Sequence, residues 1–193
     1  MNLANKLTLS RIALTFIFMW FLFLHWPYAK LCALFIFLLA SITDYYDGKI
    51  AKKYGIITDF GKLMDPIADK ILVLAAFLAF VELKILPAWM VMIVILRELV
   101  ITGMRLTLLS KKKVVAASRA GKHKTVSQMA SIFVILVYLA IKQLAGAAFK
   151  FSWWTETLDY NIQIAIYIMM FVTVVLTLTS GLSYLKENIK ALR

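Results

Sequence analysis

The sequence predicts an all-α integral membrane protein with six transmembrane helices. Of its 193 residues, 63% are hydrophobic and only 17% are charged, whereas roughly 25% of the residues in a soluble domain are charged. About six apolar runs are long enough to cross a bilayer, and a soluble domain of this size needs none. The single cysteine, Cys32, excludes an intramolecular disulfide framework. We therefore expect one membrane domain over residues 1–193, without a separate soluble domain.

The first two spans are expected at about 8–26 and 28–53. Lys6 and Arg11 precede the uncharged part of the first span, an order that is also typical of a signal peptide. Because no small-residue cleavage site follows, we interpret this segment as a retained helix. The second span continues past its apolar part as a helix that includes Asp44.

The four later spans are expected at about 62–82, 87–109, 124–144 and 160–185. Pro66 suits the first turn of the third span, because a backbone N–H is not needed there. The connections between the spans are short, so consecutive helices run antiparallel. An even number of spans places both termini on the same side of the membrane.

The basic residues divide unevenly between the two ends of the expected helices. Eighteen of the 22 lysines and arginines fall on one side, and such an excess marks the cytoplasmic side. Both termini are therefore expected in the cytoplasm. The lysines at 111–113 suit topological anchoring and attraction to anionic membrane lipids. Since the net charge of +12 is assigned to the membrane face and to a site, no nucleic-acid partner is expected.

Half of the ten acidic residues fall within 26 residues, at the end of the second span and the start of the third: Asp44, Asp47, Asp59, Asp65 and Asp69. In a helix, residues three and four apart share one face. One such stripe consists of Asp44, Asp47, Gly48 and Ala51. Two carboxylates thus lie beside two residues with almost no side chain.

A second stripe follows the turn and consists of Gly61, Asp65 and Asp69. Because the two helices are antiparallel neighbours, the stripes can face each other near the cytoplasmic interface. Asp59 fits neither stripe and is interpreted as a loop or capping residue.

Four carboxylates facing lipid would be hard to offset, because each costs on the order of 2.5 to 3.5 kcal/mol at the centre of a spanning helix. Divalent cations would neutralise them. Oxygen ligands without a nearby His or Cys favour Mg²⁺ or Mn²⁺ over zinc, and four carboxylates suit two ions. The alternative is that these acids are plain helix-end residues paired with the many lysines.

Gly48 and Ala51 share their stripe with two of the expected metal ligands. Small residues on a membrane helix often serve close packing against another helix. Next to a metal site, they favour a flat ligand close to the backbone, such as a nucleotide base or ribose. Lys52 follows directly and can meet a phosphate.

Together these residues resemble the signature of the CDP-alcohol phosphotransferases, integral membrane enzymes of phospholipid synthesis. The signature reads Asp44-x2-Asp47-Gly48-x2-Ala51-Lys52-x8-Gly61-x3-Asp65-x3-Asp69. Its one departure is Lys52, where the family usually has arginine, so a positive charge is kept and a bidentate fork is lost. The six-span pattern extends the resemblance over nearly the whole chain.

The resemblance implies transfer of a phosphatidyl group from CDP-diacylglycerol to an acceptor hydroxyl, with release of CMP. It implies that Asp44, Asp47 and Asp65 hold the metal ions. It further implies that Asp69 lies at the same metal site and is the general base. The nucleotide is expected against Asp44, Gly48, Ala51, Lys52 and Gly61.

Within the family, the segments NLANKLTLSRI, LRELVITGMR and GKHKT followed by Gln128 resemble the bacterial members that use sn-glycerol 3-phosphate as acceptor. This acceptor is a dianion and requires a basic pocket. The acceptor phosphate is expected at Arg105, Arg119 and Lys122, with Arg97 and Lys124 near the same end. Arg105 is favoured because Glu98, Thr102 and Arg105 share one polar helix face, which is costly inside a span unless it is used. The alternative is that this basic cluster only follows the positive-inside rule.

Asn5, Thr8 and Arg11 form a polar stripe that enters the first span. Helix capping and interfacial anchoring explain this stripe, and the resemblance also allows it to line the nucleotide or headgroup cavity. The resemblance further implies a homodimer in the bacterial cell membrane, surrounded by membrane lipids.

Two other functions stay open at this point. The first is a synthase of the same family with another acceptor, which would make cardiolipin, phosphatidylinositol phosphate or phosphatidylserine. The second belongs to another class, a cation or proton transporter that uses its intramembrane carboxylates as a transport path.

Overall fold

The computed structural model describes the backbone of residues 3–54, 59–110, 119–148 and 154–192, and the side chains of residues 9–43, 70–108, 124–146 and 154–186. Within these backbone ranges the chain forms six α-helices and no strand. The helices are α1 (Leu3–Phe23), α2 (Ala29–Tyr54), α3 (Asp59–Glu82), α4 (Ala88–Ser110), α5 (Arg119–Gln143) and α6 (Glu156–Leu192). A single π-helical turn, Leu144–Ala148, extends α5. The expected all-α fold is confirmed.

Most of the helices begin and end within a few residues of the expected bounds, and α6 differs the most. It was expected over 160–185 and covers Glu156–Leu192. At its start, the hydroxyl of Thr155 accepts a hydrogen bond from the backbone N–H of Leu158 at 3.2 Å. Acidic side chains in the first turn, including Asp159, complement the positive end of the helix dipole. Capping, rather than hydropathy alone, therefore determines where this helix begins.

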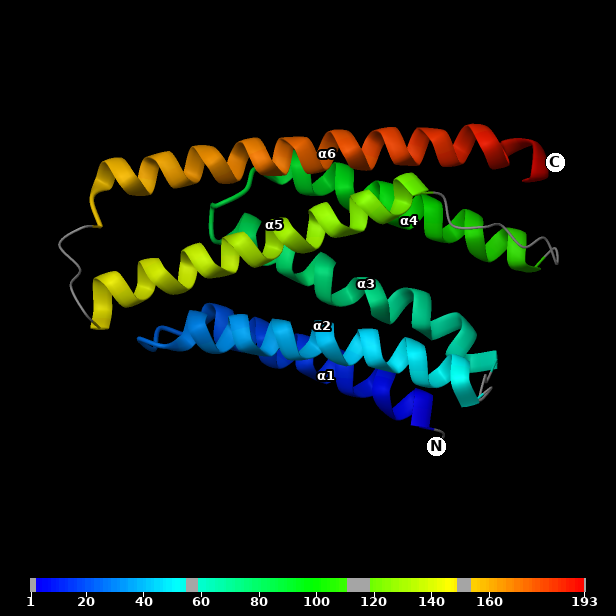
Figure 1. Cartoon of the computed structure of the whole chain (residues 1–193), viewed down its shortest axis with the longest axis horizontal. Coiled ribbons are helices and arrows are strands. Elements are labelled where there is room, and N and C mark those ends of the chain that lie inside the picture. Colours follow the sequence, from blue (N-terminus) through cyan, green and yellow to red (C-terminus); the bar gives the residue numbers. More distant parts are fainter. Residues whose placement is uncertain (1–2, 55–58, 111–118, 149–153, 193) are drawn as a thin grey trace.

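The helices form an elongated bundle in which neighbours in sequence are not always neighbours in space (Figure 1). Helix α1 packs against α2 and α3, whereas α6 packs against α4 and α5. Helix α5 also contacts α2 and α3, so that it connects the two groups. The N- and C-termini lie toward the same end of the bundle. The carboxyl-terminal half of α2, the amino-terminal half of α3 and the start of α5 lie at this end too.

An apolar core runs through the bundle and includes side chains from every helix. Its largest fully buried members include Phe18, Phe37, Phe77, Phe80, Met90, Ile135 and Met170. The rings of Phe18 in α1 and Phe37 in α2 lie 5.9 Å apart between centroids, within the range of favourable aromatic pairs. Shape-matched packing of this kind holds helices together in a lipid environment, where apolar burial alone gives little advantage.

Hydroxyl side chains add polar contacts between α5 and α6. Thr173 lies 2.6 Å from Ser127 and 3.0 Å from Ser131 between hydroxyl oxygens. The Thr173 hydroxyl also donates to the backbone carbonyl of Met169. Small hydroxyl residues at this contact let the two backbones approach closely.

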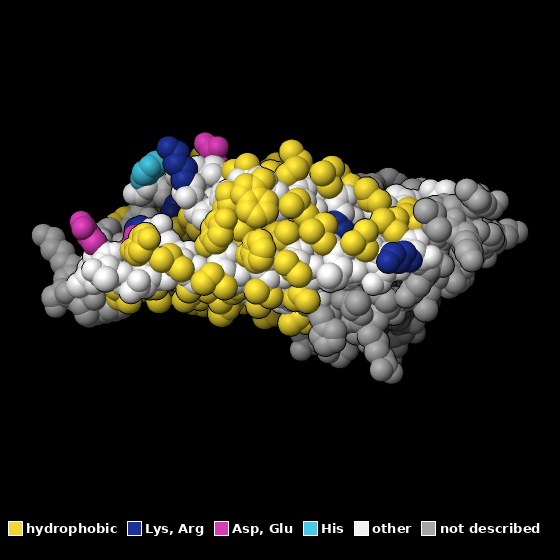
Figure 2. Space-filling model, turned by 90° about the horizontal axis from the view of Figure 1, so that it is seen from above, with side chains coloured by type: hydrophobic (Ala, Val, Ile, Leu, Met, Phe, Trp, Pro, Cys, Tyr) yellow, Lys and Arg dark blue, Asp and Glu magenta, His cyan; other side chains and the backbone are white. Residues whose placement is uncertain are grey.

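Large apolar side chains are also abundant on the outside of the bundle. Figure 2 shows an apolar surface over its middle, with charged side chains toward the ends. Phe16 and Trp20 of α1 are 72% and 70% exposed, and similar residues follow along α4 and α6. Large apolar areas on the outside of a protein mark contact with a membrane or with another protein.

Two helical segments in the described part of the chain are long and apolar enough to cross a membrane: Lys124–Gly146 and Glu156–Lys186. Two shorter apolar helices cover Leu9–Phe23 and Ala29–Thr43. These findings and the apolar exterior are consistent with a membrane protein. The number of six spans stays a prediction.

Helix α3 ends in a hydrogen-bonded cap with a left-handed residue. Lys84 has a φ of 58°, and its N–H bonds to the carbonyl of Val81. The N–H of Ile85 bonds to the carbonyl of Phe80. This pattern is a Schellman motif, whose left-handed position is usually glycine because a Cβ atom is strained there.

We expect Lys84→Gly to stabilise the protein by about 1 kcal/mol, because glycine removes this strain. The change should raise the thermal unfolding midpoint in detergent by ~2–4 °C. Glu82→Gly is the matched control, since Glu82 has a helical backbone, and this change should lower stability by about 1 kcal/mol at most. Equal losses in both variants would contradict the assigned cap.

Candidate functional site

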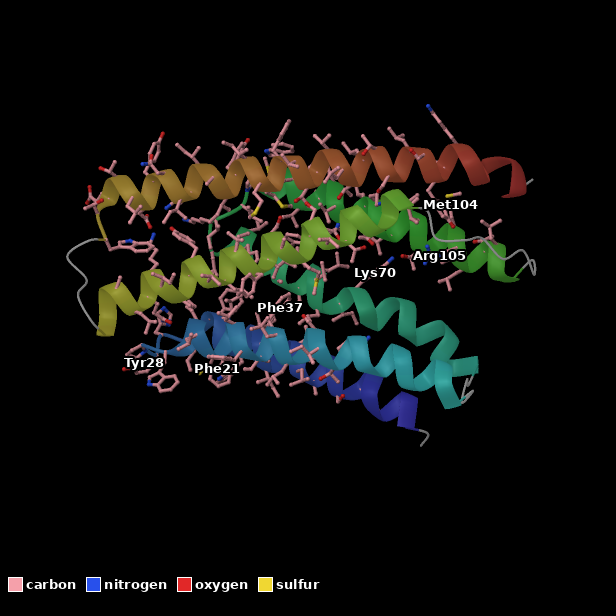
Figure 3. All side chains as sticks on the ribbon, in the orientation of Figure 1. Phe21, Tyr28, Phe37, Lys70, Met104 and Arg105 are labelled. Carbon is pink, nitrogen blue, oxygen red and sulfur yellow. The ribbon has the colours of Figure 1, made fainter. Side chains whose placement is uncertain are left out.

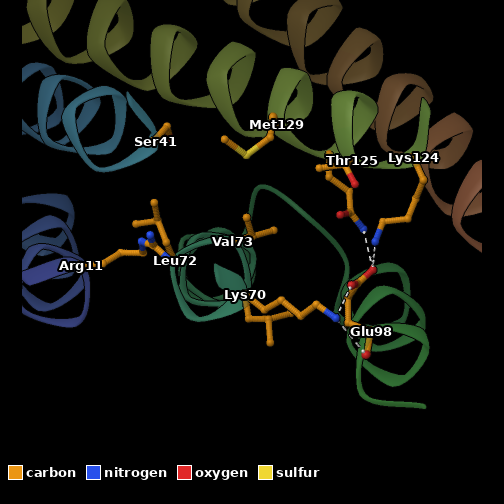
Figure 4. Close-up of a pocket in the computed structure, with 11 residues that line it drawn as sticks. Arg11, Ser41, Lys70, Leu72, Val73, Glu98, Lys124, Thr125 and Met129 are labelled. Atoms are coloured by element: carbon orange, nitrogen blue, oxygen red, sulfur yellow. Dashed lines mark hydrogen bonds and ion pairs between the residues drawn. The ribbon is translucent and has the colours of Figure 1, made fainter. Parts of the chain in front are cut away.

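A cavity of about 250 Å³ lies among the first five helices (Figure 4). Its polar lining consists of Arg11 from α1, Ser41 from α2, Lys70 from α3, Glu98 from α4, and Lys124, Thr125 and Gln128 from α5. Arg11, Glu98, Lys124 and Gln128 are all buried. Buried polar and charged groups are costly unless they are paired or used. The cavity is therefore the main candidate for a binding site among the described side chains.

The cavity lies next to the helix segments that carry the aspartate signature. Ser41 precedes Asp44 by three residues in α2, which is less than one helical turn. Lys70 directly follows Asp69 in α3. The cavity thus borders the aspartate-bearing segments of both helices in sequence.

Glu98 is the centre of the polar network at this cavity, and it is only 3% exposed. Its Oε1 atom accepts hydrogen bonds from Lys124, from Nη1 of Arg97 at 3.2 Å and from Nε2 of Gln128 at 3.5 Å. Its Oε2 atom lies 3.3 Å from Nζ of Lys70. Lys70 and Lys124 reach this carboxylate from different helices, as Figure 4 shows. One carboxylate thus joins α3, α4 and α5.

Two more contacts extend this network. Thr102 accepts a hydrogen bond from Nζ of Lys70 and donates to the backbone carbonyl of Glu98 at 2.6 Å. Nη2 of Arg97 donates to the hydroxyl of Ser180 in α6 at 3.1 Å. The network therefore connects four helices.

The charges around the cavity do not balance. Arg11, Lys70 and Lys124 line it as cations, and Glu98 is the single acid among the described lining residues. Arg97 adds a further cation to the Glu98 network. An excess of positive charge with low-dielectric walls attracts anions strongly. The cavity therefore suits an anionic ligand better than a neutral or cationic one.

The residues expected to hold the acceptor phosphate are only partly described. Arg105 is exposed in α4 and does not line the cavity, although Figure 3 places it toward the same part of the bundle as Lys70. It shares the helix face of Glu98 but lies seven residues further along, which is about 10 Å. Arg119 and Lys122 belong to the first turns of α5, and their side chains lie outside the described residues.

The sequence did not single out Lys70 as a site residue, and it placed Glu98 only on a polar helix face. The signal for Lys70 was a lysine directly after the last aspartate of the signature, at the start of an apolar run. Lys124 was expected near the acceptor end, and Arg11 was expected in a polar stripe that can line a cavity. The structure places both at the cavity.

The aspartates themselves are described only by their backbone. Asp44 and Asp47 belong to α2, whereas Asp65 and Asp69 belong to α3. The structure does not describe the side chains of these four aspartates, or those of Ala51 and Lys52. Gly48 and Gly61 are likewise described only by their backbone. No group of three acidic, histidine or cysteine side chains occurs among the side chains that are described.

The helical backbone nevertheless fits the expected donor set. A helix through 44–47 and another through 65–69 maintain the spacings that place each pair of carboxylates on one face. Oxygen donors of this kind are what Mg²⁺ and Mn²⁺ prefer. These residues are therefore suited to a hard divalent cation.

A helical bundle with paired aspartates at adjoining helix ends and a buried cationic cavity beside them defines a class of enzyme that handles phosphate esters. The comparison of sequences identifies the family. The sequence model of the CDP-alcohol phosphatidyltransferase family matches residues 1–185, which is nearly the whole chain. This chain belongs to the CDP-alcohol phosphatidyltransferase family.

Several curated relatives bear one of two related names. A CDP-diacylglycerol–glycerol-3-phosphate 3-phosphatidyltransferase of Bacillus subtilis is 38% identical over 100% of this chain and 97% of its own length. A protein of the same name from Rickettsia bellii is 35% identical over 70% of this chain and 75% of its own length. A probable phosphatidylglycerophosphate synthase of Mycobacterium tuberculosis is 33% identical over 98% of this chain and 82% of its own length.

Gly181 of α6 lies against the side chain of Arg97, so substitutions at this glycine can show how closely Arg97 packs against α6. A Cβ atom at Gly181 would lie 3.0 Å from Cγ of Arg97, whereas a Cβ atom at Gly103 in α4 would meet nothing within 4 Å. Gly103→Ala should therefore stabilise the protein by about 1 kcal/mol through helix propensity alone. Gly181→Ala should lose this gain, because overpacking costs about 1 to 3 kcal/mol and pushes Arg97 away from Glu98.

Thermal unfolding of both alanine variants in the same detergent measures the difference. An equal rise of the unfolding midpoint in the two variants would contradict a close fit of Arg97 against α6.

Proposed function

We propose that this protein transfers the phosphatidyl group of CDP-diacylglycerol to sn-glycerol 3-phosphate, which gives phosphatidylglycerophosphate and CMP. The observation that carries this proposal is the buried, net-positive cavity beside the aspartate-bearing helices. Such a cavity favours a phosphorylated acceptor over a neutral one. The names of the relatives, including the full-length match from Bacillus subtilis, support the same acceptor. Family membership favours a transferase over a cation or proton transporter.

The acceptor phosphate is proposed to bind in the cavity. Lys70 and Lys124 line it from opposite helices, and Arg11 lines it from α1. The three cations supply donors for a phosphate dianion, and charge-assisted hydrogen bonds of this kind are the strong ones. Arg105, Arg119 and Lys122 are proposed to guide the acceptor to the cavity and to contact its phosphate at the outer side.

The reaction centre is proposed at the aspartates. Asp44, Asp47, Asp65 and Asp69 would hold two divalent ions, Mg²⁺ or Mn²⁺. When bound, such ions neutralise a pyrophosphate and stabilise the charge on a leaving phosphate. Asp69 takes the proton of the acceptor hydroxyl as a new oxygen–phosphorus bond forms and the bond from that phosphorus to CMP breaks.

The nucleotide is proposed to lie along α2. Gly48 and Ala51 leave room for the cytidine beside the backbone, and Gly61 does the same from α3. Asp44 lies at the border of the nucleotide and the metal site, and Lys52 meets a phosphate of the donor. This placement leaves the cavity at Lys70 for the acceptor.

The membrane placement follows from the charge distribution and the apolar exterior. We propose six transmembrane spans, one membrane domain over residues 1–193, an active site near the cytoplasmic interface and both termini in the cytoplasm. The protein is proposed to act as a homodimer in the bacterial inner membrane.

Purified protein in detergent with Mg²⁺ and CDP-diacylglycerol should release CMP when sn-glycerol 3-phosphate is added. Serine, inositol phosphate and phosphatidylglycerol, each offered alone, should give less than about a tenth of that rate, because a site built for one polar acceptor discriminates strongly against others. A chelator should abolish the reaction, and added Mg²⁺ or Mn²⁺ should restore it. CMP release that depends on serine or inositol phosphate instead would overturn the proposed acceptor.

Asp69→Asn tests the general base separately. The variant should insert into the membrane and bind donor, but its kcat should fall by about 10² to 10⁴, the usual contribution of a general base. CMP release under saturating acceptor measures the loss. Full activity at neutral pH would remove this role from Asp69.

A further inference from the structure

The network around Glu98 raises a question that the proposed function does not answer. A site for a phosphate dianion needs cations, yet here a buried carboxylate lies among them. Glu98 is 3% exposed and faces three cationic side chains, Lys70, Arg97 and Lys124. A carboxylate in this position competes with an anionic ligand for the same donors. It would weaken binding if it had no other purpose.

The geometry shows what Glu98 does to these cations. Lys70 comes from α3, Arg97 from α4 and Lys124 from α5, and each has a nitrogen that bonds to the Glu98 carboxylate. Lysine side chains are flexible, and without a shared partner, two like charges would separate. Glu98 therefore holds the two lysines of the cavity at fixed positions.

The position of Lys70 gives this arrangement a consequence for catalysis. Lys70 directly follows Asp69, and its Nζ atom is bound by both Glu98 and Thr102 of α4. This contact ties the aspartate-bearing part of α3 to α4. A disturbance at Glu98 is thus transmitted both to the anion cavity and to the helix that carries Asp65 and Asp69.

We infer that Glu98 is a positioning residue of the acceptor site: it holds the Nζ atoms of Lys70 and Lys124 in place beside the aspartate-bearing segment of α3, and it limits how tightly the cavity binds a phosphate dianion. This inference rests on the proposed function for the identity of the acceptor. The expected binding of a phosphate anion to the cavity does not depend on the proposed function.

Glu98→Gln separates the two parts of this role, because it maintains the shape and removes the charge. With no carboxylate to compete, inorganic phosphate should bind about threefold more tightly. The Nζ atoms of the two lysines are then held less firmly in the cavity, so kcat should fall by about tenfold. The KM for sn-glycerol 3-phosphate should fall together with kcat. A merely structural defect lowers the folded fraction and leaves KM unchanged.

Asp159→Asn is the matched control. Asp159 is also an acid in a network with a lysine, a tyrosine and a glutamine, formed by Lys142, Tyr138 and Gln163, but it lies away from the cavity. The same acid-to-amide change there should lower thermal stability and leave the dissociation constant for phosphate and the KM for acceptor unchanged.

The binding measurement is the rise of the thermal unfolding midpoint of the full chain with increasing inorganic phosphate, in metal-free buffer. Turnover is measured separately as CMP release. Glu98→Asp gives a second test if Glu98→Gln does not fold. This variant keeps the negative charge, but its shorter side chain cannot hold both lysines at once. The kcat of the folded protein should therefore fall, without tighter binding of phosphate.

In folded Glu98→Gln, a phosphate affinity and KM within twofold of wild type, or weaker phosphate binding, would overturn the inference. An unchanged kcat in folded Glu98→Asp would overturn it as well. If the wild-type protein binds phosphate but releases no CMP with sn-glycerol 3-phosphate, the proposed function fails instead. The two failures are therefore distinguishable.

Discussion

One buried carboxylate, that of Glu98, sets how the polar part of this bundle is assembled. A charge away from water must be paired, and removing one partner of such a pair costs about 3 to 5 kcal/mol. Glu98 finds its partners on α3, α4 and α5, and Arg97 extends the network to Ser180 of α6. These helices cannot separate at this level without leaving a charge unpaired. Elsewhere the helices are held together mainly by apolar packing, which is less directional than an ion pair or a hydrogen bond.

The same network explains why a cavity exists beside it. Helices α1 and α5 each pack against both α2 and α3, and the cations they carry, Arg11 and Lys124, repel each other and Lys70. A fully packed interior would need more acids than the described lining contains. A bound anion from outside the chain can neutralise the remaining positive charge. A second polar network, in which Asp159 is matched by Lys142, Tyr138 and Gln163, ties α5 to α6.

Much of the fold followed from the sequence because apolar runs and polar interruptions mark helix ends clearly. Five of the six helices begin and end near their expected bounds. Helix α6 begins earlier because Thr155 caps it before the apolar run begins, and it also extends to Leu192 at its other end. The family also followed from the sequence, since fixed spacings along α2 and α3 are local. The role of Lys70 did not follow, because it depends on how α3 meets α4. The choice of Arg105 among the basic residues of α4 and α5 depended on helical periodicity, which defines a face of the helix but not a depth along its axis.

Charge also explains why the proposed acceptor site and the aspartates lie in separate places. Four carboxylates repel a phosphate dianion unless cations intervene, so an acceptor phosphate would not approach them first. The cavity at Lys70 and Lys124 offers a positive region one residue from Asp69 along the chain. An acceptor whose phosphate binds there can extend its hydroxyl toward the aspartates while its charge stays away from them. In the proposed mechanism, Glu98 limits the attraction of this positive region, so that the acceptor is not held out of reach of the proposed reaction centre.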